Sequence, residues 1–349
     1  MKILVVISSL QIGGEQRALN TLSDEFVKLG NNVDIYVLSP KVDKQFDFNP
    51  SINITYHSNS GALKNIDRVR DIRKTIKNNA YDVVIGFAVI PSILCSLAGY
   101  RTNVPVVVCE RNDPMIYRNA LKTLRSIAYR LCTAGIFQTK DAADCFPYMK
   151  KKTVIPNPIN RAIPDVYTGV REKSIVCTSR FTKAKNQDVL VEAFDRIHEK
   201  HADYILEMYG DGVEKDRLIE NINNKGLADR ILIHDAVPNI LDIIRKKEVF
   251  VLPSKHEGYP NSLVEAMALG LACISTDCRI GGPKDIITDH NNGLLVTVDS
   301  VDELEQALDE LLSNKELIKK FQNNSVRIRT RLKADIIAEN WMNYIRSIL

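Results

Sequence analysis

The sequence lacks the features that mark a membrane-spanning or a disulfide-rich protein. No apolar run reaches the roughly 18 residues that a spanning helix requires. The seven cysteines form no CxxC motif and no Cys/His ligand spacing, so neither a disulfide framework nor a zinc site is expected. We interpret them as thiols in a reducing cytoplasm, and the apolar start MKILVVISSL as a buried first strand.

Low-complexity tracts and internal repeats are missing too. Hydrophobic residues make up 45% and charged residues 26% of the 349 residues, which excludes a disordered or fibrous chain and predicts about two domains. The net charge of +4 is unevenly divided, since residues 1–164 carry +9 and the remainder carries −5. The basic half suggests an anionic partner such as nucleic acid, phospholipid or a diphosphate-linked substrate, and a solvated surface is the alternative.

Short β-branched runs alternate with helical stretches, a pattern typical of α/β domains with parallel sheets. In the first half we expect strands at 3–8, 32–39, 83–87, 104–108 and 134–138. A segment rich in Pro and Asn at 153–166 fits an interdomain linker. The pattern then restarts, with strands expected at 175–178, 205–209, 231–234, 249–252, 272–276 and 293–296. The sequence therefore predicts two doubly wound domains, with chemistry on the loops that follow strands.

The most informative segment is HEGYPNSLVEAMALG at 256–270, where two glutamates flank a predicted loop–helix junction. Glu257 lies in the loop, and Glu265 lies in the helix, with seven residues between them. The residues between them that form the loop and helix start are Gly258, Tyr259, Pro260, Asn261 and Ser262. A helix start binds anions such as a diphosphate, and the carboxylates can accept hydrogen bonds from hydroxyls. By spacing alone, a capped helix with a surface Glu is the alternative.

Two cations, Arg180 and Lys185, follow the first predicted strand of the second half. They could neutralise a diphosphate leaving group, or they could be solvated surface charges. A Tyr-Gly-Asp-Gly turn ends the next strand, where Tyr209 and Gly210 line a base or ribose pocket or form a plain turn.

Two features of the first half also follow predicted strands. Gly13 and Gly14 allow close backbone approach to a ligand phosphate or sugar, or form a tight turn. Glu110, Arg111 and Asn112 in VCERNDP could bind an acceptor or donor sugar, or pair with each other as a structural ion cluster.

Residues 117–132 predict an amphipathic basic helix. Its cations and apolar residues are Arg118, Lys122, Arg125 and Arg130, and Leu121, Leu124, Ile127, Ala128 and Leu131. Such a helix can anchor to a membrane surface, or pack on its own domain with a basic outer face.

Taken together, RFTKAKNQDVL, YGDG, HEGYPNSLVEAMALG and GGPKDIITDHNNGLLV, in this order, resemble glycosyltransferase family 4, the retaining nucleotide-sugar transferases of the GT-B fold. The similarity covers nearly the whole chain, including the Gly-Gly loop and the IPNPI linker. It implies two Rossmann-like domains facing across a cleft: an N-terminal acceptor-binding domain at 1–165 and a C-terminal nucleotide-sugar-binding domain at 170–329. The helix at about 330–349 can pack on the second domain or cross back to the first.

The resemblance implies roles for the matching residues. Arg180 and Lys185 match the diphosphate-binding pair, Glu257 matches the Glu that contacts donor-sugar hydroxyls, and Glu265 matches the Glu that holds the ribose. We expect Arg180, Lys185 and Glu257 to be catalytic. The remaining expected donor-binding residues are Gly13, Gly14, Tyr209, Gly210, Gly258, Tyr259, Pro260, Asn261, Ser262 and Glu265.

One departure from the family pattern is Arg111, which stands where many members have a His. An Arg cannot act as a base, so we assign sugar or acceptor binding to it, with Glu110 and Asn112. The family mechanism needs no enzyme nucleophile, because the donor phosphate takes the acceptor proton on the same face. No Asp-x-Asp metal site is evident, so we expect neither a metal nor another cofactor.

ERNDP and PNSLVEAMALG most resemble members that assemble bacterial O-antigen, capsule or lipid-linked oligosaccharide. The resemblance implies a hexosyltransferase that uses a UDP-hexose or UDP-N-acetylhexosamine and a glycan on polyprenyl diphosphate. It implies a cytoplasmic protein in peripheral contact with the anionic inner face of the plasma membrane, and no nucleic-acid partner. The alternatives are a sugar-nucleotide epimerase of similar architecture and a non-catalytic nucleotide- or glycan-binding protein. The presence of both cations and both glutamates argues against a degenerate, inactive copy.

Overall fold

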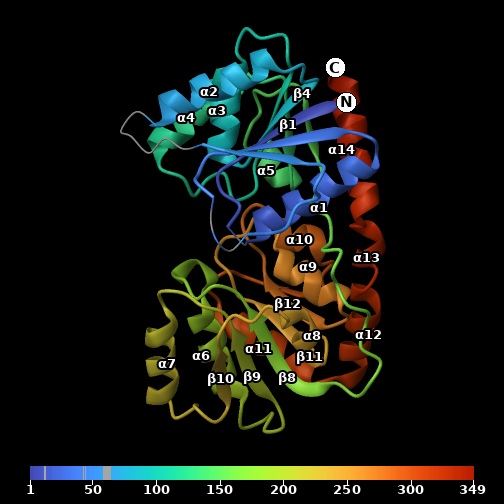
Figure 1. Ribbon diagram of the computed structural model, residues 1–349. Helices are drawn as coiled ribbons and strands as arrows, with labels where there is room; N and C mark the ends of the chain where they lie inside the picture. The colour runs from blue at the N-terminus through green and yellow to red at the C-terminus, as the bar shows by residue number, and fades with distance from the viewer. Residues whose placement is uncertain (12, 42, 44, 58–63) are drawn as a thin grey trace. The chain divides into compact units, whose positions relative to one another are not determined.

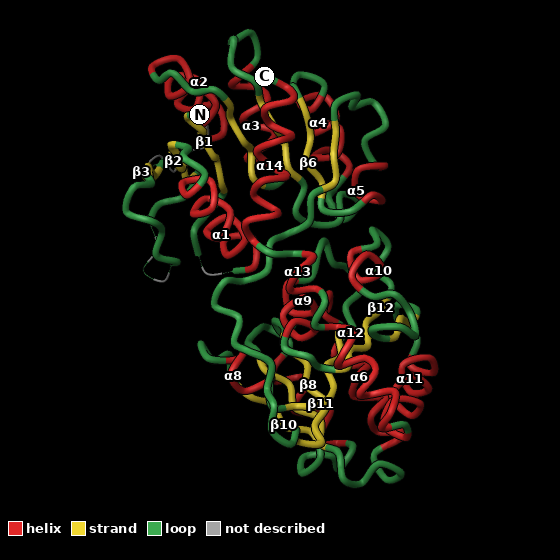
Figure 2. Tube along the Cα trace, turned by 90° about the vertical axis from the view of Figure 1, so that its right-hand side faces the viewer, coloured by secondary structure: helices red, strands yellow, loops and turns green. Residues whose placement is uncertain are grey.

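Two separate parallel β-sheets organise the chain, each in its own structural unit (Figures 1 and 2). The computed structural model describes residues 1–11, 13–41, 43, 45–57 and 64–349. The first unit comprises residues 1–161 and 332–349, and the second comprises residues 162–331. The doubly wound α/β architecture expected from the alternating pattern is thereby confirmed.

The sheet of the first unit has seven parallel strands in the order β3-β2-β1-β4-β5-β6-β7. Their bounds are β1 (Lys2–Ile7), β2 (Asn32–Val37), β3 (Asn53–Tyr56), β4 (Val83–Phe87), β5 (Val106–Cys109), β6 (Ala134–Phe137) and β7 (Lys152–Val154). The central strands are continuous apolar runs because helices cover both faces of the sheet.

Helices lie on both sides of this sheet (Figure 1). On one side lie α2 (Lys64–Asn78), α3 (Val89–Gly99) and α4 (Asn119–Tyr129), and on the other lie α1 (Gly14–Lys28) and α14 (Ala334–Ile348). The short α5 (Lys140–Asp144) connects β6 to β7. The C-terminal helix α14 belongs to this unit because its apolar stripe is buried against α1. The ring of Trp341 lies 6.1 Å from that of Phe26 and 6.4 Å from that of Phe87.

The sheet of the second unit has six parallel strands in the order β10-β9-β8-β11-β12-β13. Their bounds are β8 (Glu172–Thr178), β9 (Ile205–Tyr209), β10 (Ile231–His234), β11 (Lys247–Leu252), β12 (Ala272–Thr276) and β13 (Leu294–Val296). The helices of this unit are α6 (Gln187–Ile197), α7 (Lys215–Asn224), α8 (Ile240–Ile244), α9 (Asn261–Ala268), α10 (Gly282–Ile286), α11 (Val301–Ser313), α12 (Lys315–Ser325) and α13 (Ile328–Arg331). Figure 2 shows α6 and α8 on opposite sides of the strands, as right-handed crossovers require when the strand order reverses.

Two strands escaped the sequence prediction. The edge strand β3 is short and half polar (NITY), so it carries no apolar run. The strand β7 has three residues and begins immediately before the segment that composition assigned to the linker. The unit boundary, between residues 161 and 162, falls inside that segment.

Phe26→Ala is expected to lower the free energy of unfolding of the first unit by about 3–5 kcal/mol, because it empties a buried site beside Trp341. The chain has one Trp, so its fluorescence in a urea titration reports on this unit. Ile66→Ala in α2 removes a side chain that is 49% exposed and serves as the control. It should change stability by less than about 0.5 kcal/mol, and an equal effect of the two variants would contradict the packing.

Candidate functional site

Two loops of the second unit meet at the carboxyl edge of its sheet. Arg180 lies in the loop after β8, and the Tyr-Gly-Asp-Gly motif begins at Tyr209, the last residue of β9, and continues into the following turn. The Phe181 N–H donates to the Asp211 carbonyl at 2.9 Å, which joins the two loops. A Cβ on Gly210 would lie 2.0 Å from the Ser179 carbonyl oxygen, and one on Gly212 would lie 2.2 Å from that of Phe181. The glycines are therefore required because the loop that carries Arg180 packs directly on the turn.

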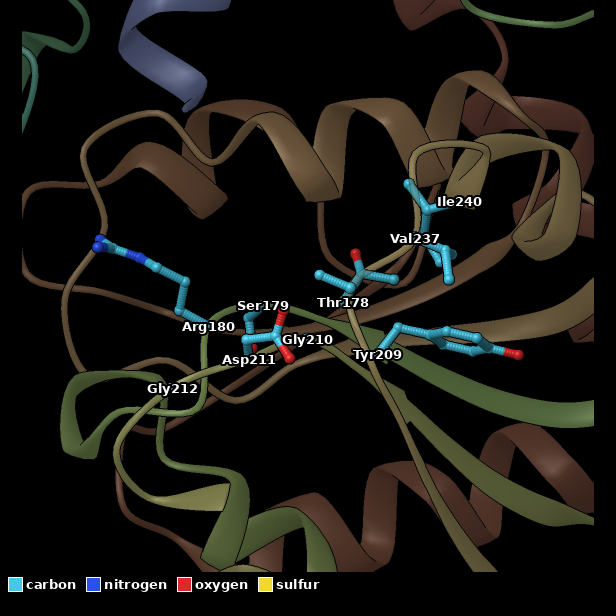
Figure 3. Close-up of a pocket in the computed structure, with 10 residues that line it drawn as sticks. Thr178, Ser179, Arg180, Tyr209, Gly210, Asp211, Gly212, Val237 and Ile240 are labelled. Carbon is cyan, nitrogen blue, oxygen red and sulfur yellow. The ribbon is translucent and has the colours of Figure 1, made fainter. Parts of the chain in front are cut away.

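A pocket of about 460 Å³ opens beside these loops (Figure 3). It is lined by Thr178, Ser179, Arg180, Tyr209, Gly210, Asp211, Gly212, Ala236, Val237 and Ile240. In Figure 3, Val237 and Ile240 form one wall, and the Arg180 side chain extends away from them on the opposite side. The volume and the apolar wall are typical of a site for a flat organic group with a polar end.

The side chain of Tyr209 points away from Arg180 in Figure 3. Its hydroxyl donates to Glu207 at 2.7 Å, and its ring stacks on His234 with centroids 4.4 Å apart. Tyr209 therefore lines the pocket from the end of β9. Its hydroxyl is already hydrogen-bonded to Glu207.

An ion pair joins two of the expected site residues, Lys185 and Glu257. The Lys185 ammonium donates to Oε1 of Glu257 at 2.5 Å, and the Ser254 hydroxyl donates to the same oxygen at 2.7 Å. The side chains of Lys185 and Glu257 are 21% and 11% exposed. The residues lie 72 positions apart, but they follow β8 and β11, which are neighbours in the sheet. The carboxyl ends of adjacent parallel strands bring the two loops together.

The loop after Glu257 leads into α9, which begins at Asn261 with Pro260 as its N-cap. The first N–H groups of a helix have no intrahelical acceptor, so this start is suited to an anion. A Cβ on Gly282 would lie 1.9 Å from the Gly258 carbonyl oxygen, so the Gly-Gly-Pro segment at 281–283 packs directly against the loop. Glu265 is 7% exposed, and Ser262 lies between it and the helix start.

Tyr259 is buried beneath this loop. Its hydroxyl accepts a hydrogen bond from Arg331 at 2.9 Å, and Arg331 also pairs with Asp285 at 2.7 Å. Burial raises the pKa of the Tyr259 phenol above its ordinary value. These contacts give Tyr259 a structural task in holding the loop.

The glycines of the first unit lie where β1 leads into α1. Gly13 is the N-cap of α1 with an extended backbone, and Gly14 is exposed. A Cβ on Gly13 would lie 2.7 Å from the side-chain oxygen of Gln16 and 3.7 Å from the Gln11 carbonyl oxygen. The first turn of α1 also carries Glu15, where burial raises the carboxyl pKa to about 7 against the opposing charge of Arg111.

Arg111 follows β5 and is held flat by aromatic rings. Its guanidinium carbon lies 4.0 Å from the Phe87 ring centroid and 5.4 Å from that of Trp341, and Nη1 donates to Oδ1 of Asn157 at 3.0 Å. Nε and Nη2 are buried with no hydrogen-bond partner in the structure. A guanidinium with unused donors is suited to a phosphate or a sugar oxygen. The neighbouring Asn112 is exposed.

Glu110 is turned into the first unit. Its Oε1 accepts hydrogen bonds from Tyr129 at 2.8 Å and from Arg125 at 3.3 Å, both in α4. The residue is 1% exposed, and burial raises its carboxyl pKa to about 7 against the opposing charge of Arg125. This arrangement favours a structural ion pair over the sugar-binding role expected from the sequence, although the partner is Arg125 and not Arg111.

Two protein-family models match the chain. The model for Glycosyltransferase Family 4 matches residues 12–162, and the model for Glycosyl transferases group 1 matches residues 164–327. The chain belongs to glycosyltransferase family 4. The resemblance inferred from the four motifs is thereby confirmed.

Curated relatives of this glycosyltransferase match over its full length. A Campylobacter jejuni alpha-1,4-N-acetyl-D-galactosaminyltransferase, named for a GalNAc-GalNAc-diNAcBac-PP-undecaprenol substrate, is 25% identical over 100% of this chain and 99% of its own. The amylovoran biosynthesis glycosyltransferase AmsD of Erwinia amylovora is 23% identical over 97% and 98%.

Solved structures confirm the GT-B fold of this glycosyltransferase. HepE of Anabaena, in complex with UDP and glucose, has a TM-score of 0.84 at 16% identity and covers 99% of this chain and 100% of its own. TarM of S. aureus has a TM-score of 0.82 at 14% identity and covers 99% and 98%.

Several residues of the candidate site were not predicted from the sequence. Val237 and Ile240 lie after β10 in the segment HDAVPNI, whose position behind a predicted strand was the available signal. Ser254 precedes Glu257 by three residues and had no distinguishing pattern. Trp341 and Asn157 contact the Arg111 guanidinium from distant parts of the chain, so sequence spacing could not predict them.

Gly282→Ala is expected to destabilise the second unit by about 3 kcal/mol, because the added methyl group meets a backbone carbonyl that cannot easily move. Thermal unfolding followed by circular dichroism measures the effect. Gly226→Ala is the control: its φ of +70° costs about 1 kcal/mol, but nothing lies within 4 Å of the added Cβ. Equal losses in the two variants would contradict the packing of residues 281–283 on the Gly258 loop.

Between pH 4.5 and 7 the wild type is expected to lose stability relative to Glu110→Gln. The folded pKa of Glu110 is raised to about 7, so the unfolded state releases this proton first and is favoured as pH rises. Glu110→Gln removes the titrating group. Urea titrations across this range measure the difference, with the exposed Glu220→Gln as control. A constant stability difference between wild type and Glu110→Gln would contradict the raised pKa.

Proposed function

We propose that the chain is a retaining, metal-independent hexosyltransferase. It moves a hexose or N-acetylhexosamine from a UDP-sugar to a glycan on polyprenyl diphosphate, in the assembly of bacterial surface polysaccharide or oligosaccharide. The observation that carries the proposal is the Lys185–Glu257 ion pair at the same sheet edge as the pocket that Arg180 borders. An apolar wall, two cations and a carboxylate match the successive parts of a sugar nucleotide.

The donor is expected to bind with its base against Val237 and Ile240, where the pocket wall is apolar. Arg180 borders this pocket, and Lys185 lies in the same loop, so both are suited to the diphosphate. The start of α9 offers further N–H donors. The UDP complexes of HepE, which shares the fold, support a nucleoside-diphosphate sugar as the donor.

Glu257 is expected to accept hydrogen bonds from the sugar hydroxyls, and Glu265 to accept them from the ribose. Ser254 and Lys185 already fix the Glu257 carboxylate through Oε1. These two hydrogen bonds fix the plane of the carboxylate and therefore also the direction of its other oxygen, Oε2. A carboxylate fixed in this way loses little side-chain freedom when sugar binds.

In the proposed reaction the anomeric carbon loses its bond to the diphosphate and gains one to the acceptor oxygen on the same face. The acceptor proton passes to an oxygen of the departing UDP. Arg180 and Lys185 stabilise the charge that develops on this leaving group. Arg111 takes no proton because guanidinium remains charged, and we assign it to an anionic or hydroxyl group of the acceptor.

The nature of the acceptor rests on the relatives. Two Campylobacter relatives are named for glycans on diphospho-undecaprenol, at 25% and 26% identity. No helix among the described residues is long and apolar enough to cross a membrane. Peripheral contact with the cytoplasmic face of the plasma membrane would bring the chain to such an acceptor.

Lys185→Ala is expected to weaken UDP binding at least about tenfold, because it removes a charge-assisted contact to the diphosphate. Glu257→Gln should keep UDP affinity within a factor of about three, yet lower transfer at least about 100-fold. Calorimetry with UDP and UDP-sugars, and transfer to a polyprenyl-diphosphate glycan, both with a chelator present, measure these effects.

The neighbouring Lys183→Ala, an exposed residue of the same turn, is the control and should bind and react like the wild type. Unchanged UDP affinity of Lys185→Ala would contradict the diphosphate role. Conversion of a UDP-sugar without an acceptor would favour an epimerase. Tight UDP binding without transfer would favour a binding protein.

A further inference from the structure

The helix α4 presents an apolar face to solvent. Leu124, Ile127 and Leu131 are 45%, 56% and 37% exposed. Their spacing of three and four residues places Leu124 and Ile127 on one face of α4, and Leu131 in line with them just after the helix end. Met115 and Ile116, in the segment before the helix, are 43% and 42% exposed. These five residues form what we call the α4 apolar face.

The interior side of the same helix holds a charge. Arg125, which the sequence pattern placed with the surface cations, is 4% exposed. Its Nη1 donates to Glu110, its Nη2 donates to the Pro114 carbonyl at 2.9 Å, and its guanidinium carbon lies 4.9 Å from the Phe146 ring centroid. A helix of a soluble domain ordinarily buries its apolar stripe and exposes its charges. In α4 the ion pair is inside, and Leu124 and Ile127 are outside, which indicates that a partner covers them.

Cations surround the α4 apolar face. No Asp or Glu occurs between residues 114 and 140, whereas Arg118 and Arg130 are exposed and Lys122 is half-buried. Arg130 lies over the ring of Tyr148, with the guanidinium carbon 4.2 Å from the centroid. An apolar face within a cationic rim is complementary to a surface that offers hydrocarbon beneath anionic groups.

We propose that the α4 apolar face docks on an anionic lipid bilayer, with the aliphatic side chains in the acyl boundary and the cations among the headgroups. A second copy of this chain fits less well, because a two-fold contact would oppose Arg118, Lys122 and Arg130 to the same cations. The choice of a bilayer also rests on the proposed function, which places the acceptor in a membrane.

The docking face is connected to the expected acceptor loop. Arg125 and Tyr129 of α4 bind Glu110, which directly precedes Arg111 and Asn112. The inner side of α4 is thereby fixed to the start of that loop, while its outer side carries the apolar face. Docking would hold the loop at a set distance from the bilayer that contains the acceptor.

The test is sedimentation of the full chain with vesicles of phosphatidylcholine, with and without phosphatidylglycerol. Leu124→Gln with Ile127→Gln should weaken binding to the anionic vesicles about tenfold or more, because two partly exposed apolar side chains lose their favourable transfer. Val170→Gln with Val213→Gln is the matched control, since these residues are 94% and 90% exposed in the second unit, and it should bind like the wild type.

The charge contribution is tested with Arg118→Gln and Lys122→Gln together. Each cation near an anionic surface contributes about 1 kcal/mol, so this pair should lower binding to phosphatidylglycerol vesicles about 25-fold and reduce its dependence on salt. The variants change side chains at the surface, and circular dichroism checks that they fold. Vesicle binding that survives both double changes would overturn the proposal, as would an effect confined to the oligomeric state in light scattering.

UDP affinity, measured on the same variants, separates this proposal from the proposed function. It should equal that of the wild type, because none of the substituted residues lies in the donor site. Loss of vesicle binding with normal UDP affinity supports the docking face. Normal UDP affinity with unaltered vesicle binding rejects the docking face alone, and failure of every form to bind UDP rejects the proposed function alone.

Discussion

The proposed donor half of the site depends on the ion pair between Lys185 and Glu257. The 2.5 Å contact exists because β8 and β11 are adjacent parallel strands, so the loops that carry the two residues leave the same edge of the sheet. Each charge is largely withdrawn from water and would be costly there without the other. The pair therefore keeps a cation and an oriented carboxylate in place before any ligand arrives, which is the preorganisation that the proposed transfer requires.

Direct backbone contacts hold the loops that carry this chemistry. Gly210 and Gly212 let the turn after β9 lie against the loop with Arg180, and Gly282 lets residues 281–283 lie against Gly258. A side chain at any of these positions would meet a carbonyl oxygen at about 2 Å. The glycines of the motifs YGDG and GGP are thus needed because each allows two loops to pack against each other. They position the loops that carry Arg180 and Glu257, and we expect them to affect the proposed reaction only in this way.

The sequence predicted those parts of the fold that depend on local patterns. Apolar strands alternating with amphipathic helices gave the doubly wound units, and β3 was missed because an edge strand with half its residues polar has no such pattern. The motifs also contain both loops of the proposed donor site. The Lys185–Glu257 contact could not be predicted, because only the strand order brings the two residues together. The contact of Arg111 with the Trp341 ring could not be predicted either, because it depends on where α14 packs.

Helix α4 shows why a periodic pattern alone cannot assign faces. Its sequence mixes apolar and basic residues, and whether one of the cations turns inward is decided by whether a buried charge finds partners. Glu110 and the Pro114 carbonyl supply those partners to Arg125, so the helix turns this charge inward and leaves Leu124 and Ile127 outside. Glu110 is adjacent to Arg111, so the contact that sets the face of α4 also fixes the start of the loop assigned to the acceptor. One ion pair thus links the surface proposed to meet the lipid with the residues proposed to meet the glycan.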